Sequence, residues 1–228
     1  MIQGNTISLI IPCKNERKGL DIVFSTVPAC VDEVIIVDYK STDGTTEFAS
    51  SKGARVFHEP HKGYGAAYKR GMREAKSDII VTSDGDGTYP IAEIPAMVAY
   101  LLDNGFDFIS GCRFPLKDQK SMHTWNFTGN IIITAIAVAL FRYKVTDLLS
   151  GMWVFKRDVL KHLKLRSSGW DFSEEITLEA IHRPEVNFAE YHINYYERVG
   201  VTKLQPYIAG IQNILYLFYM KLIYLFGG

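Results

Sequence analysis

Short apolar runs alternate with longer polar segments through the first half of the chain. Residues 7–12 are almost entirely apolar and end at a proline, which predicts a buried strand. The same pattern predicts strands at residues 31–37, 54–58, 79–83 and 107–111. Four helices are predicted between these strands, and each follows polar residues. Two of them end near residues 27 and 52, and the other two cover residues 66–75 and 91–104. This alternation predicts an α/β fold, a mostly parallel sheet with helices on both faces.

The second half of the chain is more apolar. Residues 170–180 predict a helix, and residues 186–196 predict a strand with alternating side chains. The run IIITAIAVALF at residues 131–141 is apolar on all sides. Its eleven residues are too few to cross a hydrocarbon core of ~30 Å. Two interpretations stay open, a core helix and a helix that lies in the membrane interface.

The last segment, residues 206–226, predicts an amphipathic helix. Its apolar stripe consists of Tyr207, Ile208, Ile211, Ile214, Leu215, Phe218, Leu222, Leu225 and Phe226. The other face carries Gln212, Asn213, Tyr216, Tyr219, Lys221 and Tyr224. Such a helix is expected to lie along a bilayer surface, or to pack on a membrane-protein partner or a second copy of the chain. A spanning helix is the weaker alternative, because polar residues lie in mid-segment.

Composition narrows the class of protein. Twenty-five basic residues balance twenty-five acidic ones, so no overall field attracts nucleic acid and no nucleic-acid partner is expected. Cys13, Cys30 and Cys112 lack metal-ligand spacing, which is typical of reduced thiols in the cytosol. No signal peptide precedes the first predicted strand, so we expect a peripheral protein on the cytoplasmic side of a membrane.

The stretch IIVTSDGDGTYP, residues 79–90, carries the main candidate chemistry. Asp84 and Asp86 follow a predicted strand and are separated by one glycine. Residues i and i+2 of an extended chain point to the same side, so both carboxylates can face one point beyond the strand. Two hard oxygen ligands with open positions suit Mg²⁺ or Mn²⁺ bound to a diphosphate.

Two other interpretations of this stretch are open. A solvated acidic turn is the simplest. An apolar strand followed by DGDGT also resembles the first motif of haloacid-dehalogenase-type phosphatases, with Asp84 as nucleophile and Asp86 as acid and base. That motif normally lies on the opening strand, whereas about 80 residues of predicted βα structure come first here. Position therefore argues against a phosphatase.

Polar residues also follow the earlier predicted strands. Glu16, Asp38 and Lys62 lie at or beyond the ends of three of them. Ligands of parallel sheets bind outside the carboxyl ends of the strands, so these side chains are expected to converge with Asp84 and Asp86. Such a rim suits a nucleotide.

Seven motifs in order carry a resemblance to a known family. They are IPCKNE, VDYKSTDGT, HKGYGAAYKRGM, DGDGTYP, GCRF, TDLLSG and ERVGVTKL. Together they resemble the family 2 inverting glycosyltransferases of GT-A fold, most closely the branch with dolichol-phosphate mannose synthase and polyprenyl-phosphate sugar transferases. The resemblance implies a GT-A (Rossmann-like) catalytic domain at residues 1–204, followed by a membrane-interface helix at residues 205–228.

The resemblance implies a donor site at the strand ends. Asp84 and Asp86 would hold Mg²⁺ or Mn²⁺ on the donor diphosphate, with Thr88 beside them. The residues implied or expected around the base, the ribose and the rest of the nucleotide sugar are Pro12, Lys14, Asn15, Glu16, Val37, Asp38, Lys62, Gly63 and Gly85. Tyr39 stands where the family often has a second acid, so the sequence does not choose between GDP and UDP.

The resemblance also implies catalytic residues in the second half of the chain. Arg113 lies in GCRF, which is similar to the family's GSRF and implies a guanidinium that faces a phosphate. Asp147 would lie near the transferring sugar. Glu174 and Glu175 are alternatives for the sugar hydroxyls, and we include Glu175 among the catalytic candidates. The remaining two catalytic candidates are Arg198 and Lys203. They lie in a loop similar to the family's R-x-G-x-S-K-L and are expected to neutralise phosphate oxygens.

The acceptor can be weighed on chemical grounds. A hydroxyl acceptor needs a base, whereas a phosphate monoester is already largely ionised at neutral pH, its second pKa being about 6. The candidate site offers arginine and lysine more clearly than a histidine base. We therefore predict metal-dependent transfer of mannose, glucose or N-acetylhexosamine from a nucleotide diphosphate sugar to a polyprenyl or dolichyl phosphate. Alternatives are a sugar or lipid-linked glycan acceptor, the phosphatase, and a membrane-bound subunit without catalysis.

Overall fold

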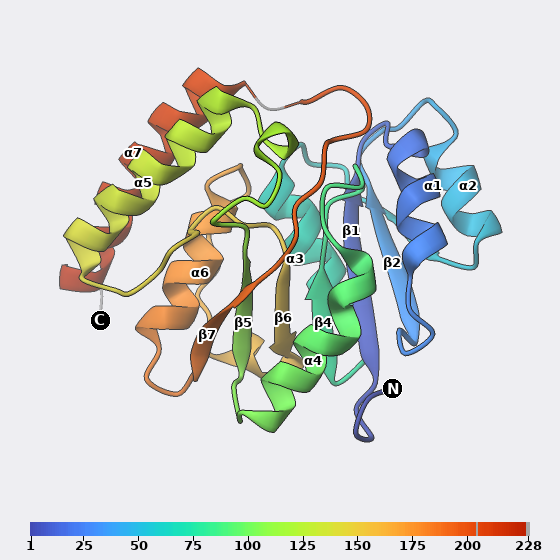
Figure 1. The fold of residues 1–228 in the computed structure, drawn as a ribbon, viewed down its shortest axis with the longest axis horizontal. Helices are drawn as coiled ribbons and strands as arrows, with labels where there is room; N and C mark the ends of the chain where they lie inside the picture. The colour runs from blue at the N-terminus through green and yellow to red at the C-terminus, as the bar shows by residue number, and fades with distance from the viewer. Residues whose placement is uncertain (204, 227–228) are drawn as a thin grey trace.

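A central sheet brings strands from both halves of the chain together (Figure 1). The computed structural model describes residues 1–203 and 205–226, so the predicted domain boundary at residue 204 lies outside the described residues. Within these residues the strand order is β3-β2-β1-β4-β6-β5-β7. The strands are β1 (Ile7–Cys13), β2 (Glu33–Asp38), β3 (Arg55–His58), β4 (Ile79–Thr82), β5 (Phe108–Cys112), β6 (Trp153–Lys156) and β7 (Phe188–His192).

Most neighbouring strands are parallel, as the alternating pattern predicts. β1 pairs in parallel with β2 and β4, β2 pairs with β3, and β5 pairs with β7. β6 differs, because it runs antiparallel to both β4 and β5. No strand is expected at β6 from the sequence, and β6 leads straight into the 3₁₀ helix η3 (Arg157–Lys161). The mostly parallel α/β architecture is confirmed.

Helices cover both faces of the sheet. Along β1, Leu9 and Ile11 pack in a core with α1 and α4, while Ile10 packs on the other face with α3 and α6. The α-helices are α1 (Arg17–Thr26), α2 (Thr45–Ser51), α3 (Tyr64–Glu74), α4 (Ile94–Asp103), α5 (Thr124–Phe141), α6 (Phe172–His182) and α7 (Pro206–Phe226). Two more 3₁₀ turns are η1 (Ile91–Glu93) and η2 (Gln119–Ser121).

The last strand is shorter than its pattern predicts. β7 ends at His192, and the chain then leaves the sheet. It crosses the end of β4, where the N–H of Tyr196 donates to the carbonyl oxygen of Thr88 at 2.9 Å. The segment after β7 therefore reaches the rim of the sheet at the top of the view in Figure 1 before the chain enters α7.

α5 and α7 lie side by side at one edge of the molecule (Figure 1). The rings of Trp125 and Tyr207 are 6.0 Å apart at one end, and those of Phe141 and Tyr224 are 5.6 Å apart at the other. The helices thus run in the same direction. They share a core with Leu178 of α6, which attaches the pair to the rest of the fold.

α7 packs on the protein through a face that carries both polar and apolar side chains. Asn213 is buried, and the Tyr216 hydroxyl donates to Glu175 Oε1 at 2.6 Å. Eight of the nine residues of the predicted stripe are between 49% and 83% exposed: Tyr207, Ile208, Ile211, Leu215, Phe218, Leu222, Leu225 and Phe226. The helix therefore packs inward through Ala209, Asn213, Leu217 and Met220 and leaves most of its predicted apolar stripe exposed. A surface helix of a soluble protein packs such a stripe inward.

By length and composition, α5 and α7 are both long and apolar enough to cross a membrane. α5 has 18 residues and begins at Thr124, so it is longer than the eleven-residue run that the pattern singled out. Ile133 and Phe141 of α5 are buried in the core, whereas Trp125 and Ile132 are exposed. The helix therefore combines both of its expected readings, core on one side and exposed apolar surface on the other.

α1 approaches the segment after β4 very closely. A Cβ on Gly19 would lie 2.2 Å from the carbonyl oxygen of Gly85 and 2.7 Å from Cα of Asp86. Both are backbone atoms, which cannot move aside as a flexible side chain can. A glycine at this position is therefore what lets α1 support the paired aspartates.

We expect Gly19→Ala to lower the free energy of unfolding by about 1–3 kcal/mol, because the backbone must shift to admit the methyl group. Urea unfolding followed by circular dichroism measures the change. The matched control is Gly129→Ala in α5, where a Cβ would meet nothing within 4 Å. It should be neutral or stabilising by up to about 1 kcal/mol. Equal stability of Gly19→Ala and the wild type would contradict this close packing.

Candidate active site

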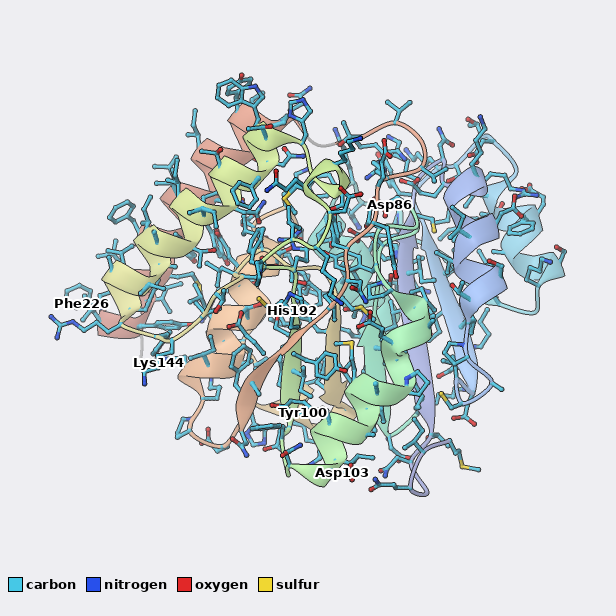
Figure 2. The ribbon with its side chains drawn as sticks, viewed as in Figure 1. Asp86, Tyr100, Asp103, Lys144, His192 and Phe226 are labelled. Atoms are coloured by element: carbon cyan, nitrogen blue, oxygen red, sulfur yellow. The ribbon has the colours of Figure 1, made fainter. Side chains whose placement is uncertain are left out.

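The carboxyl ends of β1, β2 and β4 meet at one rim of the sheet. Glu16 follows β1, Asp38 ends β2, and Asp86 follows β4. Figure 2 shows Asp86 at this rim and Asp103 at the opposite end of the molecule. The predicted convergence of acidic side chains from three strand ends is thus present in the geometry.

Two loops at the rim hold each other in place. Asn15 has a φ of 52°, in the left-handed region that asparagine tolerates better than most residues. Its N–H donates to Ser41 Oγ, and its side-chain oxygen accepts from the N–H of Thr42, both at 2.8 Å. The N–H of Glu16 donates to Thr45 Oγ1 at 3.0 Å. These bonds fix the turn after β1 against the turn after β2.

Asp84 accepts hydrogen bonds from two tyrosines of α3. The hydroxyls of Tyr64 and Tyr68 lie 2.9 and 3.1 Å from Asp84 Oδ1. Burial, and then the charge of Asp86, raise the pKa of Asp84 to about 7, although the tyrosine hydrogen bonds favour its ionised form. Neither tyrosine is among the residues predicted from the sequence. Their i, i+4 spacing at the start of a helix is the signal that could have found them.

Asp86 is buried, and both of its oxygens have partners. Oδ1 accepts from the N–H of Thr88 at 3.1 Å and from its hydroxyl at 2.7 Å. Oδ2 lies 2.6 Å from Nη1 of Arg198. Thr88 therefore orients the Asp86 carboxylate in this structure, and its direct contact with a metal stays a prediction.

Arg198 and Lys203 reach the rim from the segment after β7. Arg198 Nη2 lies 2.8 Å from Glu16 Oε1, and Lys203 Nζ forms an ion pair with the same oxygen. Lys203 also donates to the carbonyl oxygen of Asn15 at 3.2 Å. Burial raises the pKa of Glu16, and the two cations partly offset the rise. Residues that are far apart in the sequence thus form one charged cluster.

The end of β2 offers an unpaired hydrogen-bond acceptor. Asp38 Oδ2 accepts from the N–H of Ser41 at 3.1 Å and lies 3.6 Å from Nδ1 of His58. Asp38 Oδ1 is buried and has no partner among the described residues. A hydroxyl or N–H of a bound ligand would satisfy it. Beside it, Lys14 Nζ lies 5.0 Å from the centre of the Tyr39 ring.

Some predicted donor-site residues have other surroundings. Val37 is fully buried and packs in the core with α3, so its side chain does not line a base pocket, which corrects that expectation. Pro12 is half-buried within β1. Lys62 is exposed, and the described residues show no contact between it and Glu16 or Asp84.

Two predicted glycines serve close packing. A Cβ on Gly63 would lie 2.0 Å from the carbonyl oxygen of Ser168. One on Gly85 would lie 3.1 Å from Cys13 Sγ. Gly63 therefore brings the start of α3 against the loop before α6, and Gly85 brings the aspartate turn against the end of β1.

Arg113 and Asp147 form a buried pair. Nε and Nη2 of Arg113 each lie 2.7 Å from an oxygen of Asp147, and the Arg113 N–H donates to Asp147 Oδ2 at 2.9 Å. Arg113 Nη2 also donates to Asn130 Oδ1 at 2.9 Å. Their side chains are 6% and 0% exposed. The Arg113 guanidinium is bound to Asp147 in this structure, and its expected contact with a phosphate stays a prediction.

Glu175 has a full set of partners within the protein. It accepts from the N–H groups of Arg166 at 2.8 Å and Ser167 at 2.9 Å, and from the Tyr216 hydroxyl. These bonds anchor the loop before α6, and α7 as well, to α6. Glu175 therefore holds the structure together here, and its expected contact with sugar hydroxyls is not available in this arrangement.

Glu174 is the opposite case. It is fully buried, and neither carboxyl oxygen has a partner among the described residues. Burial, with the charges of Asp171 and Glu175, raises the pKa of Glu174. Its proton is therefore held more tightly than that of an exposed glutamate.

Asp84 and Asp86 are the residues that could hold a metal ion. Among the described residues, no group of three or more His, Cys, Asp or Glu side chains could do so. Two carboxylates would supply part of the coordination shell, and a diphosphate and water would supply the rest, as is usual for Mg²⁺. The Arg198 guanidinium already places positive charge 2.6 Å from Asp86. The donor set and this stand-in cation fit a divalent ion.

Comparison with known proteins relates the chain to a family. The model of Glycosyl transferase family 2 matches residues 8–164. The dolichyl-phosphate hexose transferase of Haloferax volcanii is 31% identical over 210 residues, 90% of this chain and 89% of that protein. The dolichol-phosphate mannosyltransferase of Pyrococcus furiosus is 29% identical over 76% of this chain, which spans about half (52%) of that protein's length.

Solved structures share the fold. Glucosyl-3-phosphoglycerate synthase from Mycobacterium tuberculosis, in complex with Mn²⁺, UDP and glucosyl-3-phosphoglycerate, matches with a TM-score of 0.74 at 22% identity, over 96% of this chain and 80% of that one. The complex of that enzyme with Mg²⁺ and UDP gives a TM-score of 0.77 at 22% identity, over 96% and 79%. At such identity the likeness shows the GT-A fold alone. With the family match over most of the sheet, it follows that this chain belongs to glycosyl transferase family 2 and is a glycosyltransferase.

Proposed function

We propose that the protein transfers one sugar from a nucleotide diphosphate sugar to a polyprenyl or dolichyl phosphate at the cytoplasmic face of a membrane, with the help of Mg²⁺ or Mn²⁺. The observation that carries this proposal is the outward apolar stripe of α7 on a chain that also builds the acidic rim. The names of the Haloferax and Pyrococcus relatives support a lipid-phosphate acceptor.

The rim suits the donor. Asp38 Oδ1 is a buried acceptor that a ribose hydroxyl or a base N–H would satisfy. Asp84 and Asp86 would hold the divalent ion, and the hydroxyls of Tyr64 and Tyr68 orient Asp84 toward that task. When bound, the ion stabilises the charge of the departing nucleoside diphosphate.

The residues around the rim favour an acceptor that is already ionised. Asp147 is enclosed by Arg113, so it is not available as a base. Among the described residues, no histidine has a hydrogen bond or ion pair with Asp84, Asp86 or Arg198. A phosphate monoester needs no deprotonation, because its second pKa is about 6. Arg198 and Lys203 would neutralise its oxygens or those of the donor.

The exposed apolar surface supports attachment to a membrane. Leu215 and Phe218 of α7 are 64% and 49% exposed, and Trp125 and Ile132 of the neighbouring α5 are 63% and 50% exposed. An apolar patch of this extent is unfavourable in water and would be buried in the interfacial zone of a bilayer. A lipid phosphate is presented at that depth.

A hydroxyl acceptor is a second candidate, and one observation favours it. Glu174 is a buried carboxyl without a partner, and a raised pKa is common for the acid or base of a catalytic site. A sugar or glycan acceptor would require such a group. An acceptor screen separates the two functions, since a base-dependent enzyme would prefer hydroxyl acceptors to lipid phosphate.

We expect lipid-linked sugar when the protein is incubated with GDP- or UDP-sugars, polyprenyl phosphate and Mn²⁺, measured by chromatography of the lipid phase. Asp84→Asn should reduce the rate more than about hundredfold, because the charge that binds the ion is lost. Asp103→Asn is the control, since Asp103 lies at the opposite end of the molecule in Figure 2. No lipid product with any donor would refute the proposed acceptor.

The affinity for Mn²⁺ should depend on pH. The pKa of Asp84 is about 7, so below that pH a proton competes with the ion, and the affinity should fall about tenfold per pH unit. Tyr64→Phe removes a hydrogen bond to the ionised form, raises the pKa of Asp84 and should move the midpoint to higher pH. Titration by electron paramagnetic resonance measures this, with Tyr100→Phe, remote from the rim in Figure 2, as control. An affinity that is constant from pH 6 to pH 8 is the contrary result.

Binding to vesicles should depend on the α7 stripe. Leu215→Glu should weaken sedimentation with phosphatidylcholine vesicles that contain polyprenyl phosphate by about tenfold or more, because an apolar side chain is removed from the bilayer. Gln212→Glu adds the same charge to an exposed polar position of the same helix and should bind as the wild type does. If both variants bind equally well, α7 is not the attachment surface.

A further inference from the structure

The cations expected to meet phosphate are engaged elsewhere in this structure. Arg198 bridges two carboxylates from different loops, with Nη1 2.6 Å from Asp86 Oδ2 and Nη2 2.8 Å from Glu16 Oε1. Lys203 pairs with the same Glu16 oxygen. Each of these carboxylates belongs to the proposed donor site. In this structure the charged groups of the proposed donor site therefore pair with one another.

Backbone hydrogen bonds set the position of Arg198. The N–H of Tyr196 donates to the carbonyl oxygen of Thr88 at 2.9 Å, and the N–H of Val199 donates to that of Asp86 at 3.0 Å. The next residue, Gly200, has a φ of 94°, which glycine adopts easily. The chain is therefore fixed on both sides of Arg198 and can turn directly after Val199.

The outer part of this segment is loosely packed. Val201 is 80% exposed. Residues 199–203 enclose a cavity of about 370 Å³ against the loops that carry Asn15, Glu16 and Asp43. Lifting this part would break ion pairs and open an existing space, without pulling apolar side chains from a core.

A divalent ion and Arg198 cannot share Asp86 at this distance. Asp86 Oδ1 is already bound by Thr88, so Oδ2 is the oxygen for which an ion would compete. An ion there would also place two positive groups within a few ångströms of each other, which is strongly unfavourable where solvent is scarce. Occupation by Arg198 and occupation by the ion therefore exclude each other.

We propose that the Arg198 side chain and residues 200–203 form a latch that keeps the donor site closed until the ion and the nucleotide diphosphate arrive together. Arg198 then exchanges Asp86 for phosphate oxygens, and Lys203 exchanges Glu16 for them. The latch rests on the proposed function, because it requires a divalent ion at Asp86. It adds that Arg198 weakens binding of the ion without nucleotide and strengthens binding of the ion together with its nucleotide.

This latch predicts effects of opposite sign for one substitution. Arg198→Gln should bind Mn²⁺ about fivefold more tightly without nucleotide, because no ion pair must break first. The same variant should bind UDP or GDP with Mn²⁺ more weakly, since the cation that meets the diphosphate is gone. A purely structural role of Arg198 would weaken both. Electron paramagnetic resonance with Mn²⁺, alone and with each nucleotide, measures both quantities.

Matched variants complete the experiment. Arg70→Gln in α3 removes an arginine that is also 30% exposed and paired with a carboxylate, Glu74, and it should leave both affinities unchanged. In Arg198→Lys the single ammonium cannot bridge both carboxylates, so this variant should bind Mn²⁺ about twofold more tightly than the wild type. It replaces Arg198→Gln in the experiment if Arg198→Gln does not fold. Unchanged or weaker Mn²⁺ binding by the Arg198 variants overturns the latch alone. No Mn²⁺ binding by any variant, with or without nucleotide, overturns the proposed metal site and the latch with it.

Discussion

Carboxylates gathered at one rim of a sheet repel one another, and the guanidinium of Arg198 is the group that this structure places between them. It joins Glu16 and Asp86, although it lies 182 and 112 residues away from them along the chain. Carboxylates that lose solvent need such a partner, as the raised pKa values of Glu16 and Asp84 indicate. The N-terminal strands therefore build the acidic rim, and the segment after β7 supplies the positive charge that reduces repulsion between its carboxylates.

Much of this architecture can be predicted from local sequence patterns. Short apolar runs predict the parallel strands, and polar residues at the strand ends predict the convergence of Glu16, Asp38, Asp84 and Asp86, because both patterns depend on neighbours in sequence. The amphipathic stripe of α7 is likewise visible at helical spacing. The side of α7 that faces the protein cannot be predicted in this way, because it depends on the hydrogen bond of Tyr216 to Glu175 of α6.

Most features that escaped prediction depend on pairs that are distant in sequence. Arg113 meets Asp147 across 34 residues, and Glu175 meets Tyr216 across 41, so neither charge shows its partner in its own motif. β6 is a short strand whose place is fixed by the strands on either side. Val37 lies at the rim by sequence position, but the alternation of β2 directs its side chain into the core.

The outward apolar stripe of α7 also bears on the choice of solvent for this protein. In plain aqueous buffer its outward rings and aliphatic chains have only other copies of themselves to cover them. On the proposed membrane attachment, association that grows with protein concentration would come from this uncovered stripe. On that proposal, molecular mass and stability are best measured in micelles or bicelles, which cover the stripe with apolar chains.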